Sequence, residues 1–362
     1  MKKTRKNSKY QIGLVIVGLS LLLNSCGENQ TPTGQNSGNT NDTSITNQNS
    51  RLATIKQRGK LICGVNGQLP GFSFVNEQGE YTGLDVDICR AIAAALFDDP
   101  TKVEYRALST QERFTAVQSG EVDILSRNTT YTLSRDTSVG LEFAPITFYD
   151  GQGMMVSKAS GIKTLEDLKG KTICVQAGTT TELNLSDQMR KRGIDYTPVV
   201  FDDPDAMYAA YQQGRCQAAT SDRSQLSSRR SALPKPDDHI VLDTVLSKEP
   251  LAVAVANGDS AWFDVVKWSI YALMEAEELG ITAKNISTFA NSQDPSVKRF
   301  LGAEGELGAD MGLSNDFAAR IVKHVGNYEE IYDRNITKTI GLQRGLNQLW
   351  TKGGLLYSPP FR

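Results

Sequence analysis

The sequence has little histidine, and its few cysteines lie far apart. Its 362 residues include two histidines and five cysteines, and no two cysteines form a C-x-x-C pair. Structural zinc sites take most of their ligands from these two residue types, so we expect no metal site. The sequence also lacks a G-x-S-x-G motif, and "GTTTE" at residues 178–182 lacks the G-K-[ST] ending of a phosphate-binding loop. These absences favour a protein without a cofactor and without enzymatic activity.

The sequence has no excess of charge of one sign either. Lysine and arginine together number 39 and the acidic residues 41, which gives a net charge of −2. Nucleic-acid binding requires a basic surface, so we expect no nucleic-acid partner. The composition is that of an ordinary globular protein, with 39% hydrophobic and 22% charged residues. The length exceeds what one hydrophobic core needs, which favours two lobes.

The apolar run nearest the N-terminus, "IGLVIVGLSLLL" at residues 12–23, has only 12 residues and follows a basic segment. It is too short to span a bilayer comfortably and fits the hydrophobic region of a signal peptide, with a short membrane anchor or a buried helix as alternatives. The run ends in "LNSC" at residues 23–26, which resembles the lipobox of bacterial lipoproteins. This resemblance implies a signal peptide at residues 1–25 and acylation of Cys26. Two or more acyl chains are enough for a stable membrane anchor.

Residues 26–50 consist mostly of Asn, Thr, Ser, Gly and Gln. Such a segment cannot bury enough apolar surface to offset the entropy lost on ordering, so we predict a disordered tether. A flexible chain of this length has an end-to-end distance of roughly 25–30 Å. We therefore expect the folded part to lie outside the cytoplasm, close to a membrane that it does not enter.

Short β-branched runs alternate with helical patterns through residues 60–126. The runs that predict strands are "KLICGV" (60–65), "KVEYRAL" (102–108) and "EVDILS" (121–126). Between the first two, Ile88, Ile92 and Leu96 recur at helical spacing. Ser109 and Glu112 predict the capping box of a second helix. Strands and helices that alternate in this order require a parallel sheet with right-handed crossovers.

The same alternation restarts at residue 153, with predicted strands at residues 171–176, 196–201 and 215–222. "EPLAVAVA" at residues 249–256 and a long helical pattern at residues 260–280 then return the chain to the first lobe. We therefore predict an α/β fold of two lobes, each a mixed sheet flanked by helices. Residues 51–152 and 248–362 form one lobe with a C-terminal helical extension, and residues 153–247 form the other. The two chain crossings between the lobes predict a hinge.

Four cysteines remain after Cys26, and an even number in an exported protein favours disulfides. Sequence alone allows three pairings, and buried free thiols are the alternative. We favour Cys63–Cys89 and Cys174–Cys216 because each pair then stays within one predicted lobe.

Four polar clusters follow predicted strands directly. They are Asn66, residues 127–135, residues 176–181 and residues 221–222. Ligands of open α/β sheets bind beyond the carboxyl ends of the strands, so we expect these clusters to meet in one site. An arginine and the N-terminus of a helix suit a carboxylate, and an aspartate suits an ammonium, which together describe an α-amino acid.

Each cluster also has a simpler interpretation. Thr180 and Thr181 can serve only as helix caps. Arg135 can form a surface pair with Asp136, and Asp222 at a strand end can be a turn residue. The shared position of the four clusters favours the binding site over these separate explanations.

Several longer segments carry a family resemblance. They are "NEQGEYTGLDVDICRAIAAALF", "ERFTAVQSGEVDILSRNTTYTLSRD", "CVQAGTTTELNL" and "GRCQAATSD". From about Leu52 onward the chain resembles the solute-binding proteins of polar amino acid ABC importers. "SRNTT", "DGQGMMV" and "SKEPL" are similar to the branch that binds L-amino acids in general. The resemblance implies the two-lobe, type II periplasmic binding protein fold, which closes on a free L-amino acid and delivers it to a membrane permease.

The resemblance also implies roles for single residues. Arg135 is expected to bind the ligand's α-carboxylate, with help from Thr130 and Thr180. Asp222 is expected to accept the α-ammonium, and Asn128 to add backbone or side-chain contacts.

Other positions depart from the family pattern or add to it. Asn66 stands where many members have Asp, and Leu69 stands where an aromatic side chain is common, so stacking on the ligand is in doubt and a site for basic amino acids is disfavoured. Gln176 belongs to the same ring of polar residues. Arg127 is an addition that pairs with an acidic or amide ligand side chain or, as the alternative, braces the lobe interface.

The leading hypothesis is thus a monomeric binding protein for polar, acidic or neutral L-amino acids. An enzyme that acts on amino acid-like or peptidoglycan substrates is the second hypothesis, because related folds host such enzymes. A ligand-dependent sensor is the third, but sensor chains usually continue into a transmembrane segment, which we do not expect here.

Overall fold

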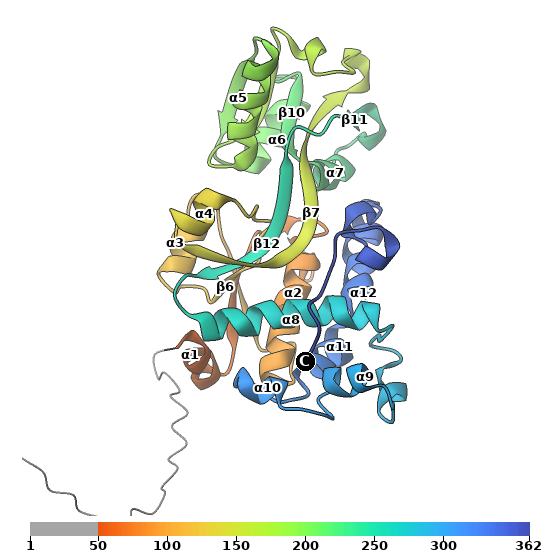
Figure 1. Cartoon of the computed structure of the whole chain (residues 1–362). Helices are drawn as coiled ribbons and strands as arrows, with labels where there is room; N and C mark the ends of the chain where they lie inside the picture. The colour runs from red at the N-terminus through yellow and green to blue at the C-terminus, as the bar shows by residue number, and fades with distance from the viewer. Residues whose placement is uncertain (1–49) are drawn as a thin grey trace, which may run out of the picture. The chain divides into compact units, whose positions relative to one another are not determined.

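The computed structural model describes residues 50–362 (Figure 1). The predicted signal peptide, Cys26 and almost all of the predicted tether lie outside the described residues. Within residues 50–362, no helix is both long enough and apolar enough to cross a membrane.

The first lobe is built on three parallel strands. Strand β1 (Leu61–Val65) lies between β5 (Val103–Ala107) and β6 (Ile124–Leu125) and pairs with both in parallel. Helices α2 (Leu84–Phe97) and α3 (Arg113–Gln118) form the crossovers between these strands. The predicted alternation of strands and helices is confirmed.

In this lobe the sequence predicts a helix capping box correctly and the length of one strand incorrectly. Ser109 and Glu112 exchange both hydrogen bonds of the predicted capping box, because each backbone N–H donates to the other side chain, at 3.1 and 3.3 Å. Strand β6 is shorter than predicted. The Asp123 carboxylate accepts the backbone N–H of Ile62 at 2.7 Å, where a longer strand would offer a carbonyl.

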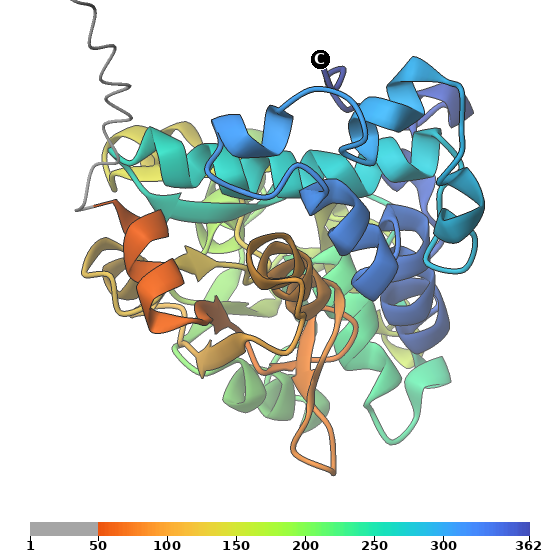
Figure 2. The ribbon, with the colours of Figure 1, turned by 90° about the horizontal axis from the view of Figure 1, so that it is seen from below.

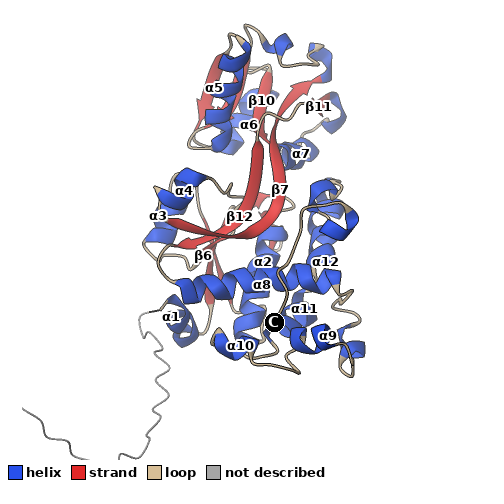
Figure 3. Ribbon diagram, viewed as in Figure 1, coloured by secondary structure: helices blue, strands red, loops and turns tan. Residues whose placement is uncertain are grey.

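The second lobe repeats the pattern. Strand β8 (Thr172–Gln176) lies between β9 (Thr197–Phe201) and β10 (Ala218–Asp222), again in parallel. Helices α5 (Thr180–Arg192), α6 (Pro204–Gln212) and α7 (Arg223–Ser231) connect and cover these strands, and β11 (His239–Val241) adds to the sheet. Figure 3 shows this group of strands with its flanking helices.

Two long strands join the lobes. Strand β7 (Leu141–Ser157) pairs with β12 (Lys248–Ala256) in an antiparallel arrangement, and the end of β7 continues into the second lobe, where it pairs with β10. The full strand order is β5-β1-β6-β12-β7-β10-β8-β9. Both strands run from one group of helices to the other in Figure 1. The predicted two-lobe α/β fold with two crossings is confirmed.

The C-terminal segment is helical and packs on the first lobe. The remaining elements of the described chain, apart from short 3-10 and π segments, are α1 (Arg51–Arg58), β2 (Gln68–Leu69), β3 (Ser73–Val75), β4 (Tyr81–Thr82), α4 (Leu133–Thr137), α8 (Ser260–Glu278), α9 (Pro295–Phe300), α10 (Leu307–Asp310), α11 (Phe317–Val325), α12 (Tyr328–Tyr332) and α13 (Lys338–Ile340).

Helix α2 packs against α8 and α11 (Figure 2), and one hydrophobic core contains residues of β1, α2, α8, α11 and α12. The exact lobe boundaries remain a prediction.

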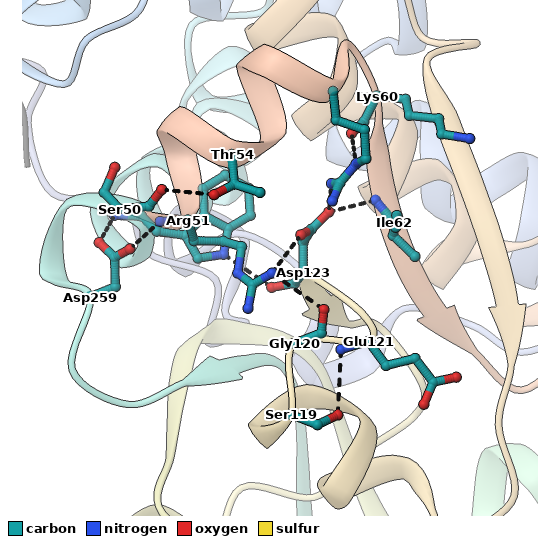
Figure 4. Close-up of polar contacts among 12 residues, drawn as sticks. Ser50, Arg51, Thr54, Lys60, Ile62, Ser119, Gly120, Glu121, Asp123 and Asp259 are labelled. Carbon is teal, nitrogen blue, oxygen red and sulfur yellow. Dashed lines mark hydrogen bonds and ion pairs between the residues drawn. The ribbon is translucent and has the colours of Figure 1, made fainter. Parts of the chain in front are cut away.

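Helix α1 is fixed to the first lobe by Asp123 (Figure 4). The buried Asp123 carboxylate forms ion pairs with Arg51 and Arg58 of α1. The backbone N–H of Arg51 also donates to Asp259 at 2.6 Å. These contacts anchor the start of the folded chain to the edge of the sheet.

Both favoured disulfides are present. Cys63–Cys89 joins β1 to α2, and Cys174–Cys216 joins β8 to the turn before β10, with Cα–Cα distances of 6.4 and 5.6 Å. Each bridge lies within one lobe, as predicted.

Candidate ligand-binding site

One cavity brings together all eight predicted ligand-binding residues. They are Asn66, Arg127, Asn128, Thr130, Arg135, Gln176, Thr180 and Asp222. The first five come from the first lobe and the last three from the second, and they lie at or just after the ends of the strands β1, β6, β8 and β10. The cavity therefore lies between the lobes, at the carboxyl ends of the strands.

Hydrogen bonds between the lobes close this cavity. The Gln176 side chain donates to the Thr110 hydroxyl at 2.9 Å, and the Asn128 side chain donates to Gln225 at 3.4 Å. The cavity has a volume of about 30 Å³, which is room for about two water molecules. An amino acid is several times larger, so its entry requires the lobes to move apart about β7 and β12.

Arg135 lies at the start of α4, where the hydroxyl of Thr132 caps the helix. Its guanidinium donates to the carbonyl of Thr130 at 2.8 Å and lies 5.2 Å from the centre of the Phe114 ring. Burial lowers the pKa of Arg135, whereas Glu249 and Asp222 act in the opposite direction. Arg135 is thus a buried cation, held in place from the first lobe and next to two carboxylates.

Arg127 makes its contacts within the first lobe. Its Nε donates to the carbonyl of Leu108 at 2.8 Å, and its Nη2 donates to the Thr110 hydroxyl at 3.4 Å. Burial lowers its pKa to about 10, although the nearby Asp85 favours the charged form. These contacts brace the loop that follows β5. Arg127 also lines the cavity, so a contact with the ligand side chain remains a prediction.

Asp222 is the last residue of β10 and is only 6% exposed. Within residues 50–362 its carboxylate forms no hydrogen bond and no ion pair. Burial raises its pKa well above the ordinary value, Asp150 and Glu249 add to the shift, and Arg135 and Arg113 oppose it. A buried carboxylate without a partner is costly, and an ammonium group from a ligand would offset that cost.

Asn128 and Asn66 are held by local contacts. Asn128 has a positive φ of 34°, and its backbone N–H donates to Asp85 at 3.0 Å. Its side-chain oxygen is buried and has no hydrogen-bond partner within residues 50–362. The Asn66 side chain accepts the N–H of Gln68 at 3.2 Å. Asn128 therefore offers a free acceptor in the cavity, whereas Asn66 is partly used in its own turn.

Glu249 adds a carboxylate that the sequence does not single out. It is fully buried in β12 and accepts hydrogen bonds from the hydroxyls of Thr130 (2.7 Å) and Thr180 (2.8 Å). Asn184 at 2.8 Å and Ser247 at 2.6 Å donate to its other oxygen. A hydroxyl has one hydrogen, so Thr130 and Thr180 cannot also donate it to a ligand while these bonds last. Glu249 thus joins both lobes beside the cavity.

Three further lining residues lie outside the four predicted polar clusters: Thr110, Arg113 and Gln225. Thr110 and Arg113 follow β5, so the strand-end argument covers them once that strand is included. Gln225 lies three residues after Asp222, on the first turn of α7. Within the described chain, no group of three or more His, Cys, Asp or Glu residues could hold a metal ion.

Comparisons with known proteins show which proteins this chain is similar to. Residues 61–286 match the bacterial extracellular solute-binding proteins, family 3. The general L-amino acid-binding periplasmic protein AapJ of Rhizobium johnstonii is 51% identical over 86% of this chain and 92% of its own length. The glutamate/glutamine/aspartate/asparagine-binding protein BztA of Rhodobacter capsulatus is 48% identical over 86% of this chain and 94% of its own length.

A solved structure extends the likeness to three dimensions. A periplasmic binding protein from Brucella ovis with glutathione bound is 51% identical, covers 86% of this chain and 99% of its own, and has a TM-score of 0.85. The resemblance to amino acid-binding proteins and the type II periplasmic binding protein fold are both confirmed. Because the family match runs through both lobes and both crossings, this chain belongs to family 3 of the bacterial extracellular solute-binding proteins.

Proposed function

We propose that this protein captures free L-amino acids outside the cytoplasm and delivers them to the membrane permease of an ABC importer. The observation that carries the proposal is one closed cavity in which the buried Arg135 and the unpartnered Asp222 lie within reach of each other's charge. A cation beside a carboxylate matches the two groups that every free α-amino acid presents.

The proposed residue roles follow from these charges. Arg135 binds the α-carboxylate and Asp222 accepts the α-ammonium. Asn128 contributes its free side-chain oxygen to the same ammonium or to a ligand amide. Thr130 and Thr180 contribute once ligand entry frees them from Glu249. Asn66, Gln176 and Arg127 face the remainder of the ligand.

The range of ligands is proposed to be broad. The polar lining offers hydrogen bonds to acidic, amide and small neutral side chains, and no residue lining the cavity is aromatic. Relatives at about half identity are named for general L-amino acids or for glutamate, glutamine, aspartate and asparagine. Glutathione, the ligand of the Brucella ovis protein, carries the same α-amino acid group on its glutamyl residue. A γ-glutamyl peptide is therefore a second candidate ligand.

Calorimetric titration of the purified protein tests the proposal. The panel is Glu, Gln, Asn, Leu, His, Arg and glutathione, together with N-acetylglutamate, in which the ammonium is blocked. We expect saturable binding of several free amino acids and no binding of N-acetylglutamate. If no amino acid binds, or if N-acetylglutamate binds as well as glutamate, the proposal is wrong.

The lipid anchor at Cys26, the signal peptide at residues 1–25 and the monomeric state belong to the same proposal. The "LNSC" sequence supports the anchor. We expect wild-type protein to partition with membranes and Cys26→Ser to be released into the soluble extracytoplasmic fraction. Light scattering of the released variant should give the mass of one chain. Equal partitioning of both forms would remove Cys26 as the anchor.

We also propose that the protein binds its ligand without converting it. Relatives and family are solute-binding proteins, and the cavity offers no histidine or cysteine for nucleophilic chemistry. After prolonged incubation with glutamate or glutathione, we expect mass spectrometry to recover the ligand unchanged. A product that forms in proportion to protein concentration would favour the enzyme hypothesis.

A further inference from the structure

Arg113 differs from the other two arginines of the cavity. It is the first residue of α3 and is only 4% exposed. Among the described residues its guanidinium has no hydrogen-bond or ion-pair partner, and its Nε is one of the few buried side-chain atoms left without one. Arg127 and Arg135 each donate to a backbone carbonyl. A buried guanidinium with no partner is costly to the folded protein, so a bound anion would compensate it well.

Phe114 holds this guanidinium at the cavity. The centre of the Arg113 guanidinium lies 4.6 Å from the Phe114 ring centre, and that of Arg135 lies 5.2 Å from the same ring. Both arginines line the cavity. The shared ring therefore presents two guanidiniums to one ligand, and a guanidinium fork suits a carboxylate with two parallel hydrogen bonds.

The three arginines differ in how many acidic residues lie near them. Arg127 has Asp85 and Glu112 nearby, and Arg135 has Glu249 and Asp222. Among the described residues, Arg113 has Asp222 as its one acidic neighbour, together with the like charges of Arg127 and Arg135. Once Asp222 is occupied by the ligand's ammonium and Arg135 by its α-carboxylate, Arg113 is left without a counter-charge. A zwitterionic head group alone cannot supply it.

We propose that Arg113 binds a second carboxylate of the ligand, so that the site favours α-amino acids that carry one. This inference rests on the proposed function, because it assigns the α-amino and α-carboxylate groups to Asp222 and Arg135. The second carboxylate belongs either to an acidic side chain, as in glutamate, or to the far end of a γ-glutamyl peptide, as in glutathione. Both ligands share the same chemistry: an α-amino acid head and a second anionic group.

The test compares matched ligands on matched variants of the purified protein. Arg113→Gln removes the charge and Arg113→Lys keeps it. Arg190→Gln removes an exposed arginine of α5 that pairs with Asp187, and it is the control. L-Glutamate is paired with L-glutamine, and glutathione with its glycine monoethyl ester. In each pair the second ligand carries a neutral amide or ester in place of the second carboxylate.

We expect wild-type protein to bind the charged member of at least one pair more tightly. Arg113→Gln should weaken binding of that member at least about 30-fold and change binding of the neutral member by less than about threefold. Arg113→Lys should keep part of the preference, and Arg190→Gln should keep all of it. The pair that responds identifies which source supplies the second carboxylate.

Two results would overturn the inference. If Arg113→Gln loses the same affinity for both members of each pair, Arg113 contacts the α-carboxylate or stabilises the fold. If the affinities do not change, Arg113 has no role in binding. Binding of free amino acids by wild-type protein would keep the proposed function intact in either case, whereas failure of wild-type protein to bind any ligand would refute both. Thermal unfolding checks the fold, and ligand-free Arg113→Gln should melt higher than wild type because an uncompensated buried charge is gone. If Arg113→Gln does not fold, Arg113→Lys decides: loss of affinity for glutamate and glutamine alike would count against the proposal.

Discussion

Replacing Asp222 with asparagine keeps the shape of the side chain and removes its charge. The variant therefore isolates the interaction that we assign to the ligand's ammonium. Two opposite charges about 4 Å apart attract each other by about 4 kcal/mol at the effective dielectric constant of a protein site. Without the carboxylate, the ammonium would face Arg135 and Arg113, whose charges repel it. We expect the Kd for L-glutamate, measured by calorimetry, to rise roughly 1000-fold.

The same substitution should stabilise the ligand-free protein. Burial raises the pKa of Asp222 well above its ordinary value of 3.8. Between that ordinary value and the raised pKa, the folded state holds a proton that the unfolded state releases, so the free energy of unfolding falls as the pH rises. Asparagine has no proton to lose. The melting temperature of Asp222→Asn should therefore match wild type near about pH 4 and exceed it increasingly as the pH rises toward the raised pKa of Asp222.

Two controls make this prediction specific. Asp187→Asn removes an exposed carboxylate of α5 and should change neither affinity nor stability noticeably. Glutarate, which is glutamate without its ammonium, should bind Asp222→Asn at least as tightly as wild type, because it has no cation for Asp222 to bind. A Kd for glutamate in Asp222→Asn within about threefold of wild type would refute the role of Asp222.

Three further substitutions test other parts of the molecule. Arg135→Ala should cost roughly 2–5 kcal/mol of binding free energy for every amino acid, because the ligand's α-carboxylate stays buried and unpaired; unchanged titrations would exclude Arg135 from the site. Glu249→Gln replaces an acceptor oxygen with a donor and should make closure of the two lobes less favourable by about 1–3 kcal/mol. The expected signs are a lower ligand affinity and a larger radius of gyration in X-ray scattering. An unchanged scattering profile would argue against this role of Glu249. Arg58→Ala leaves the buried Asp123 carboxylate with Arg51 as its remaining ion-pair partner and should lower the free energy of unfolding in urea by about 1–3 kcal/mol, a value reduced because Arg58 is partly exposed; an unshifted urea midpoint would show that this pair contributes nothing.

The strand-end argument accounts for what the sequence could predict about the site. Polar residues directly after strands β1, β6, β8 and β10 all reach the cavity, because parallel strands end at the same edge of a sheet. Arg113 was not predicted because it follows β5, and β5 is not among the strands whose ends were expected to form the site. Arg113 also directly follows the capping residue Glu112, and in the sequence it looks like an ordinary surface arginine at the start of a helix.

Glu249 could not be found from local sequence. Its partners Thr130 and Thr180 are 119 and 69 residues away along the chain. Thr130 comes close to Glu249 because it forms an antiparallel bridge with Leu251 of β12, a contact between segments far apart in the sequence. The length of β6 was predicted wrongly for a similar reason. The apolar pattern predicts a strand that would accept the Ile62 N–H with a backbone carbonyl, but the Asp123 carboxylate accepts it instead. Patterns of apolar residues predict elements, whereas contacts between distant segments decide where elements end.

The placement of the two disulfides limits what redox chemistry can do to this molecule. Both bridges lie within a lobe, and among the described residues no cysteine connects the lobes. Oxidation therefore cannot lock the cleft open or shut, and reduction would loosen one lobe without uncoupling it from the other. The disulfides thus stabilise each lobe, whereas hydrogen bonds between the lobes hold the cleft closed. The lobes can therefore be cross-linked internally without hindering the opening and closing of the cleft.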